Sequence, residues 1–273
     1  MTPLLMSELP LIVLGACTGS IAGLLGGMLG IGGGVVMVPL IFYGLVLSHM
    51  APDLAAHVAV STSLAAILPA AMISSFVHWR AGNTDLDFLR KWGPGIALGV
   101  VAGQLAAPHL RGCVLTGVFA LVCVVSAARF IFPERFRPLR QAPPEGSLRQ
   151  ALSAMIGVSS ALGGVGGGIV TNVVMNLSGV PMHKSIGRAA AVGVVVSVPA
   201  TIIAALGPGA HGATQLGTID LAVWACIAPS QAFAAWIGAR LAQHISGPQL
   251  SRVFGVALVI TGTAMLRSVV LGA

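Results

Sequence analysis

Long apolar segments recur along the whole chain, and this feature constrains the fold more than any other. A run of about 20 apolar residues is long enough to cross a bilayer as a helix. Only 8% of the 273 residues are charged, too few to cover a soluble domain, in which about 25% are charged. The sequence therefore predicts an all-α, polytopic membrane protein. The apolar segments lie at about 9–28, 33–47, 54–79, 92–110, 112–132, 150–163, 167–181, 189–207, 218–241 and 249–271.

The charge balance and the cysteines exclude several partners. The net charge is +7, from 14 Lys and Arg against 7 Asp and Glu. The basic residues lie between the apolar segments, as in a multi-pass protein of the inner membrane, and not in a patch that would bind nucleic acid. The four cysteines form no CxxC pair and lie in or beside apolar segments, which is typical of small packing residues. We expect neither a cofactor nor a metal site.

A stretch rich in Pro and charge divides the chain. Residues 132–149, FPERFRPLRQAPPEGSLR, are predicted to be a cytoplasmic linker between a first membrane repeat at 1–131 and a second at 150–273. The N-terminal stretch has no basic start and no small-residue cleavage site, so it is interpreted as a first membrane segment and not as a signal peptide. The second segment of each repeat is too short to cross a bilayer as a straight helix.

The two repeats are copies of one another. At a constant offset of 135, residues 82–124 match 217–259 at 13 of 43 positions, against about a tenth expected by chance. Near the start of each half, GIGGG at 30–34 matches GVGGG at 164–168. Internal duplication on this scale is typical of secondary transporters.

The distribution of Lys and Arg favours an inverted arrangement of the two halves. With five segments per half, only Arg111 and Arg267 fall outside. If the first two segments of each half formed one broken span, nine Lys and Arg residues would lie inside and five outside. The rule that inner loops are positive therefore favours five segments per half, with both termini outside. The predicted inner face holds Arg80, Arg90, Lys91, Arg129, Arg135, Arg137, Arg140, Arg149, Lys184, Arg188, Arg240 and Arg252.

Glycine clusters interrupt two apolar segments and predict broken helices. A break followed by a new helix leaves free N–H groups and a positive dipole end, both of which favour an anion. The alternative is close helix packing through small residues. The predicted substrate-binding glycines are Gly30, Gly32, Gly33, Gly34, Gly164, Gly166, Gly167 and Gly168. The side chains predicted to assist them are Ser61, Thr62, Ser63, Asn172, Asn176 and Arg188, for which helix–helix hydrogen bonds or membrane anchoring are the alternatives.

The ionisable residues within the spans favour an anion over a cation as cargo. No carboxylate lies in the middle of a segment, although cation pumps and proton relays usually bury one. Asp85 and Asp220 open the fourth segment of each half, where N-terminal capping is the favoured interpretation. His57 and His78 flank the third segment, 21 residues apart, so they cannot share one ligand. Either could carry a proton, although a hydrogen-bonded structural role is favoured.

The chain resembles the sulfite exporter TauE/SafE family of transporters. The resemblance is carried by GGMLGIGGGVVMVPLI (26–41), HVAVSTSLAAILPAAMISSFVHWRAGNTDL (57–86), GPGIALGVVAGQLA (93–106), LGGVGGGIVTNVVMNLSGVPMHKSIGRAAAVG (162–193) and GARLAQHISGPQL (238–250). It implies transport of a small sulfur-containing anion such as sulfite, a sulfonate or sulfoacetate. The family motif AxGTSL has Ser61 in place of Gly here, and in the second half Arg188 and Ala189 replace the expected Thr and Ser. The second lobe of a site is therefore expected to be cationic.

Taken together, the residues and the resemblance predict a secondary transporter of small sulfur anions working by alternating access. A non-transporting membrane sensor or assembly protein is an alternative. An intramembrane enzyme using His57 or His78 is less favoured, because the chain has no HExxH motif, no paired carboxylates and no evident nucleophile. The expected partners are a sulfur anion and the lipid bilayer. A homo-oligomer is compatible with the sequence, which does not fix the oligomeric state.

Overall fold

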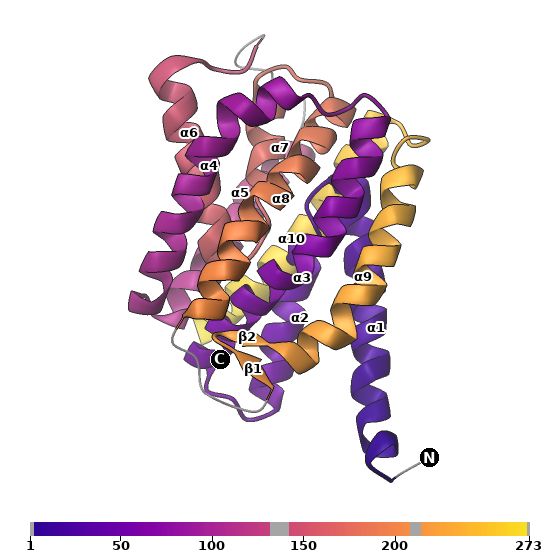
Figure 1. Ribbon diagram of the computed structural model, residues 1–273, viewed down its shortest axis with the longest axis vertical. Helices are drawn as coiled ribbons and strands as arrows, with labels where there is room; N and C mark the ends of the chain where they lie inside the picture. Colours follow the sequence, from indigo (N-terminus) through magenta and orange to yellow (C-terminus); the bar gives the residue numbers. More distant parts are fainter. Residues whose placement is uncertain (1–2, 132–141, 208–213, 272–273) are drawn as a thin grey trace.

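The computed structural model describes residues 3–131, 142–207 and 214–271 (Figure 1). Within these residues the chain is almost entirely helical, which confirms the predicted all-α membrane fold. The short strands β1 (Gln215–Leu216) and β2 (Ile219–Asp220) form a small hairpin. The helices are α1 (Pro3–Leu29), α2 (Gly34–Leu47), α3 (Pro52–Arg80), α4 (Leu86–Ala106), α5 (Gly112–Ile131), α6 (Gly146–Gly163), α7 (Gly168–Leu177), α8 (Met182–Leu206), α9 (Leu221–Leu241) and α10 (Gly247–Leu271), with a 3-10 turn η1 (Ala107–His109).

Helix lengths separate full spans from partial ones. In the part of the chain that the structure describes, five helices, α3, α5, α8, α9 and α10, are long and apolar enough to cross a membrane. Helix α2 has 14 residues and α7 has 10, so at 1.5 Å per residue they extend about 21 and 15 Å, less than the roughly 30 Å of a hydrocarbon core. The prediction that the second segment of each half is too short to span is confirmed.

Several helices begin earlier than the apolar segments predicted. Helix α8 begins at Met182 instead of 189, and α6 begins at Gly146 instead of 150. The first turns of α8 carry His183, Lys184 and Arg188, which end an apolar run in the sequence without ending the helix. Of the predicted linker, residues 132–141 lie outside the described part of the chain.

Glycines with positive φ break the first segment of each half. In the first half φ is 67° at Gly30 and 86° at Gly33, and in the second it is 69° at Gly164 and 79° at Gly167. Side chains are strained in this left-handed region, which only glycine adopts freely. Gly33 and Gly167 are the N-cap residues of α2 and α7. The helix breaks at 30–33 and 164–167 are thus real, as the glycine clusters predicted.

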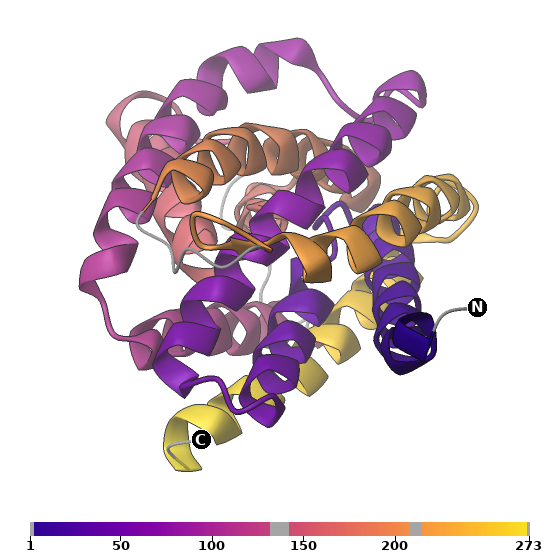
Figure 2. The same cartoon turned by 60° about the horizontal axis from the view of Figure 1, so that its bottom comes forward.

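The helices pack in reciprocal pairs between the halves. Helix α1 lies along α9, and its counterpart α6 lies along α4; the α1–α9 pair can be followed in Figures 1 and 2. Helix α3 packs on α8 and on α9, and correspondingly α8 packs on α4, while α5 packs on α10. The first helix of each half is therefore held by the fourth helix of the other half.

Glycines make the close approach of α1 to α9 possible. A Cβ at Gly23 would overlap the backbone of Gln231, and one at Gly27 would overlap the backbone of Ala235. Gly157 of α6 is equally close to the backbone of α4. At these positions, packing through small residues accounts for glycine, whereas the glycines of the helix breaks have a different role.

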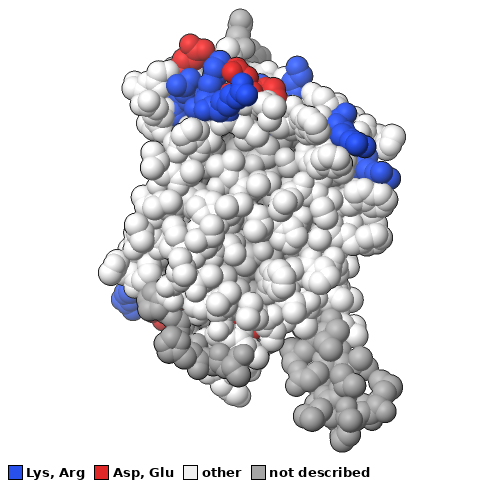
Figure 3. All heavy atoms as spheres, in the orientation of Figure 1, with Lys and Arg blue, Asp and Glu red and all other residues white. Residues whose placement is uncertain are grey.

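The basic residues gather at one end of the molecule, the upper end in Figure 3. Helix α1 begins and α10 ends at the opposite, lower end (Figure 1). Among the described residues the Lys and Arg side chains divide nine to two, in the same sets that the sequence assigned to the inside and the outside. Arg135, Arg137 and Arg140 lie outside the described residues. Which end faces the cytoplasm stays a prediction.

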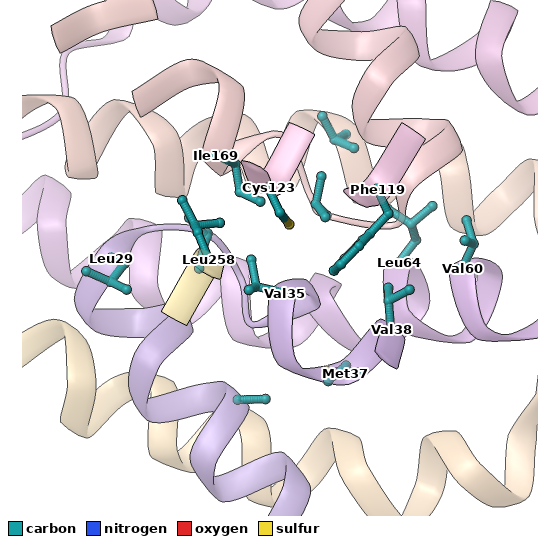
Figure 4. Close-up of a cluster of buried hydrophobic side chains, with 14 of the residues drawn as sticks. Leu29, Val35, Met37, Val38, Val60, Leu64, Phe119, Cys123, Ile169 and Leu258 are labelled. Atoms are coloured by element: carbon teal, nitrogen blue, oxygen red, sulfur yellow. The ribbon is translucent and has the colours of Figure 1, made fainter. Parts of the chain in front are cut away.

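The hydrophobic core surrounds the helix breaks. Leu29 is the last residue of α1, Val35 is the second residue of α2 and Ile169 is the second residue of α7, and all three are buried in the cluster that Figure 4 shows. Phe119 and Cys123 of α5 complete this part of the cluster and are fully buried. Cys123 is thus a packing residue, as its apolar setting predicted.

Candidate functional site

The two helix breaks meet in the middle of the bundle. Gly34 lies against the carbonyl of Gly164, and Gly168 lies against the carbonyl of Gly30. The contact is reciprocal, because the offset of 134 relates Gly30 to Gly164 and Gly34 to Gly168. The side chain of Ile67, halfway along α3, touches both breaks. Two glycine-rich corners of backbone, each with one buried apolar side chain (Ile31 and Val165), therefore face one another across the two halves.

Side chains from other elements donate hydrogen bonds to carbonyl groups at the breaks. Asn172 of α7 donates its Nδ2 to the Leu29 oxygen at 2.9 Å. Gln231 of α9 donates its Nε2 to the Gly32 oxygen at 2.6 Å. In the second half, Ser63 of α3 donates to the Gly164 oxygen at 3.0 Å. All three donors belong to the opposite half of the chain, so each break is fixed by its partner half.

The N–H groups at the start of α2 and α7 have no such partners. Within the described residues, no acceptor lies in hydrogen-bonding position for the N–H of Gly34, Val35, Gly168 or Ile169. All four residues are buried. A buried helix start normally finds acceptors for these donors, and the dipole makes both starts positive. Free N–H donors at the positive end of a helix are features that favour a small anion.

Two further polar atoms near the breaks lack partners. The Oε1 of Gln231 and the Oγ1 of Thr171 have none among the described residues, and both side chains are fully buried. Gln231 adjoins Gly33, because a Cβ there would lie 3.0 Å from the Gln231 Nε2. Gln231 is one of the few polar residues inside the apolar segments, so the sequence makes it a possible donor to an anion, although it was not in the predicted substrate-binding set.

Of the three consecutive hydroxyl residues on α3, only Ser63 reaches a break. The Ser61 Oγ accepts a hydrogen bond from Thr218 Oγ1 at 2.8 Å, and the Thr62 Oγ1 accepts one from the Asp220 N–H at 3.0 Å. Both contacts hold the β1–β2 hairpin against α3. This hairpin is the connection between α8 and α9, so Ser61 and Thr62 are engaged in fixing it.

The polar residues predicted for the site in the second half also lie in different places relative to the breaks. Asn172 lies at the breaks, and its Oδ1 accepts a hydrogen bond from Ser185 at 2.8 Å. Asn176, one turn on, donates to the Met182 sulfur at 3.4 Å and lies nearer the end of α7. Arg188 binds Asp85 at 2.8 Å, away from the breaks at the basic end.

Asp85 and Arg188 join the two halves at the basic end. Asp85 caps α4 by accepting the Phe88 N–H, as Asp220 caps α9 through two N–H groups, and both predicted caps are confirmed. The Arg188 guanidinium also lies over the Phe88 ring, 4.9 Å from its centroid. Burial raises the pKa of Asp85, but the hydrogen bonds from Arg188 and Phe88 and the charges of Arg188 and Lys184 outweigh it and hold that pKa below its ordinary value.

The histidines lie at opposite ends of α3, as their spacing predicted. The His57 Nε2 is 3.1 Å from the Leu110 oxygen, and the buried His78 Nε2 is 3.1 Å from the Gly27 oxygen. His183, which sequence reasoning missed, makes the matching contact with the Ile245 oxygen at 3.1 Å. Leu110 and Ile245 correspond at the offset of 135, so His57 and His183 anchor equivalent turns in the two halves.

Both breaks are closed to solvent in this conformation. Every residue from 30 to 34 and from 164 to 168 is buried. An anion would therefore reach the free N–H groups only after the elements around them move.

Comparison with known proteins finds similarity over nearly the whole chain. The family model described as sulfite exporter TauE/SafE matches residues 15–265. A probable membrane transporter protein of Haemophilus influenzae is 26% identical over 259 residues, which cover 93% of this chain and 97% of that protein. A probable membrane transporter protein of Methanocaldococcus jannaschii is 23% identical over 270 residues, covering 94% and 95%. No solved structure matches the chain significantly.

Proposed function

The chain belongs to the sulfite exporter TauE/SafE family, and from this premise we propose that it moves a small sulfur-containing anion, of the sulfite, sulfonate or sulfoacetate type, by alternating access. It is a multi-pass membrane transporter, and the inner membrane is the usual location for its family. The cargo, the site and the mechanism form our proposal.

The single observation that supports an anion most strongly is the pair of buried helix starts. The N–H groups of Gly34 and Gly168 are buried without acceptors among the described residues. A cation would be repelled by two positive dipole ends, whereas an oxyanion would accept several of these hydrogen bonds at once. Tetrahedral and pyramidal sulfur oxyanions have three or more oxygens for this purpose. Discontinuous helices at the repeat interface are the usual setting of transporter sites.

Alternating access would follow from inverted halves that exchange their first helices. In Figure 1, α1 rises from the lower end while α6 descends from the upper end, which supports inversion. The occluded breaks lie at the contact between the halves, so a rocking motion of one half against the other would open them to each side in turn. His78, with a buried Nδ1 that has no partner among the described residues, is the better placed of the two proposed proton carriers.

A matched pair of substitutions tests the binding site. Gln231→Glu puts a carboxylate beside the Gly32–Gly34 backbone, whereas Gln104→Glu puts one at the equally buried contact of α4 with Ala161 on α6. We expect Gln231→Glu to lower anion flux into proteoliposomes at least tenfold, because like charges repel, and Gln104→Glu to retain most of it. Sulfite, sulfoacetate, taurine and thiosulfate are compared as cargo.

The outcomes are distinct. Equal flux through the Gln231→Glu variant and the unaltered protein would overturn the site. Stabilisation by an anion in a thermal-shift assay, without flux, would favour a sensor over a transporter. Conversion of the anion into a product of different mass would favour an enzyme.

A further inference from the structure

A long groove follows the outer side of α3 and α9. Its apolar part has a volume of about 560 Å³ and is lined by Met72, Ile73, Phe76, Ala232, Phe233 and Trp236. A second hollow of about 250 Å³ shares Phe76 and Trp236 with it and continues to Arg80, Arg240 and Gln243. The two hollows therefore form one groove, apolar along its length and basic at one mouth. We call it the α3–α9 groove.

The two helices carry the same residue pattern in the same direction. On α3 the aromatic Phe76 precedes Arg80 by four residues, and on α9 Trp236 precedes Arg240 by four. The Arg80 guanidinium lies 4.8 Å from the Phe76 ring centroid, and that of Arg240 lies 3.9 Å from the Trp236 ring centroid. Each arginine is thus held at the mouth by the aromatic ring below it. From Met72 to Arg80 the helix rises about 12 Å.

No described residue forms an ion pair with the arginines at the mouth. In the described part of the chain the ion pairs are those of Lys91 with Asp87 and of Arg188 with Asp85. Arg80 and Arg240 take part in neither. Both arginines lie in the last turns of their helices at the basic end of the molecule, where Figure 3 shows blue side chains over the ends of α3 and α9. The mouth is complementary to a single anionic group.

The internal repeat indicates that the arginine and aromatic pattern is not needed for the fold. At the offset of 135, Arg240 corresponds to Leu105 and Trp236 to Val101 on α4. Leu105 is 61% exposed, so the equivalent surface at the opposite end is apolar and uncharged. The same helix packing therefore forms without arginine and tryptophan, and the basic mouth is specific to one end.

We propose that the α3–α9 groove binds one anionic phospholipid. Its phosphate lies between Arg80 and Arg240, and one acyl chain follows Met72 and Phe233 along the groove. Basic pockets between membrane helices at the cytoplasmic side suit acidic headgroups, and aromatic residues suit the level just beneath them. Phe76 and Phe233 are 50% and 65% exposed, so the groove is open to lipid from the side. The bound lipid would bridge α3 of one half and α9 of the other.

Lipid titration of the purified full-length protein tests this proposal. The protein in non-ionic detergent is titrated with phosphatidylglycerol, phosphatidylcholine or inorganic phosphate, and thermal shift and native mass spectrometry report binding. One basic residue near an anionic membrane surface contributes about fivefold in affinity. We therefore expect Arg80→Gln/Arg240→Gln to weaken phosphatidylglycerol binding about twenty-five-fold. The control Arg90→Gln/Arg252→Gln removes two exposed charges at the same end and should change affinity less than twofold.

Each remaining outcome decides the proposal. Phe233→Ala, which keeps both arginines, should weaken the phospholipid several-fold because it removes contact with the acyl chain. If both pairs of arginine substitutions weaken phosphatidylglycerol binding equally, the lipid binds through general surface charge, and the proposed site is overturned. Equal stabilisation by inorganic phosphate would mean a free anion site without lipid. A change of oligomeric state on Arg80→Gln/Arg240→Gln, measured by light scattering, would assign the groove to a second copy of the chain instead. All four arginines are exposed, so these variants should fold.

Discussion

At the scale of single residues, amides and hydroxyls that could bind cargo are engaged in holding backbone. Asn172, Gln231 and Ser63 each donate to a carbonyl of a helix break. Among the described residues, the donors left without partners there are backbone N–H groups and the Thr171 hydroxyl. An anion at the breaks would therefore meet main chain first, and the side chains would keep that main chain in position.

Asp85 provides a test of the ion pair across the halves. Asn caps helices about as well as Asp, so Asp85→Asn keeps the cap of α4 and removes only the charge that Arg188 binds. Because the pair is partly exposed, with side chains 16% and 49% accessible, we expect a loss of about 0.5–1 kcal/mol in unfolding free energy. Asp220→Asn, which caps α9 and forms no ion pair with described residues, is the control and should be nearly neutral.

The same pair predicts a pH dependence. Because folding lowers the pKa of Asp85, its contribution is complete above the unfolded value of about 3.9 and disappears as the pH falls through the folded value. The difference in melting temperature between the unaltered protein and Asp85→Asn should stay constant from pH 7 to 5 and shrink below about 4. A difference that grows on acidification would contradict the assignment.

Capping residues and helix breaks could be predicted at this scale because both are local. Asp85 stands directly before an apolar segment, which indicates a helix cap, and the GxGGG cluster indicates a helix break. Each role can be inferred from a few neighbouring residues. The partner of Arg188 could not be predicted, because Asp85 lies 103 residues away in the chain. The contacts of Ser61 and Thr62 with the β1–β2 hairpin could not be predicted either, because nothing in the local sequence reveals that hairpin.

At the scale of elements, glycine has two roles, a helix break and close helix packing. The glycines at 30–33 have positive φ at three positions and form a corner. Gly23 and Gly27, a few residues earlier, are ordinary helical residues that admit the backbone of α9. Period-four spacing is the signal for the second role, and clustering is the signal for the first.

A pair of alanine substitutions separates close approach from helix propensity. Gly27→Ala should destabilise the protein by about 1–3 kcal/mol, because its Cβ would overlap the backbone of α9. Gly117→Ala on α5 meets no atom within 4 Å and should be neutral or stabilising by up to about 1 kcal/mol. Melting in detergent measures both, and equal effects would contradict the packing of α1 on α9.

Apolar segments predicted which helices exist, but not where several begin. Helix α8 starts with polar and basic residues, so an apolar segment read from the sequence begins several residues after the helix does. The β1–β2 hairpin was also missed, since its four strand residues lie within and just before a segment predicted as one helix from 218.

At the scale of the whole molecule, the orientation is a prediction that labelling can decide. Cys113 is free and exposed at the start of α5, at the end opposite the basic residues. With the other three cysteines replaced by Ala, we expect an impermeant maleimide to label Cys113 in intact cells. Gln243→Cys in a cysteine-free background, at the basic end, should react only after the membrane is opened. The reverse labelling pattern would contradict the predicted orientation, in which both termini lie outside.

The exchange of first helices has a consequence for biosynthesis. Helix α1 emerges first, yet the surface that receives it, α9, is made about 200 residues later, which at 5–20 residues per second takes roughly 10–40 s. Through that interval the glycine face of α1 can contact only lipid or the insertion machinery. A nascent chain stalled before α9 should therefore leave α1 accessible to crosslinking with insertion factors, and completion of α9 should release it.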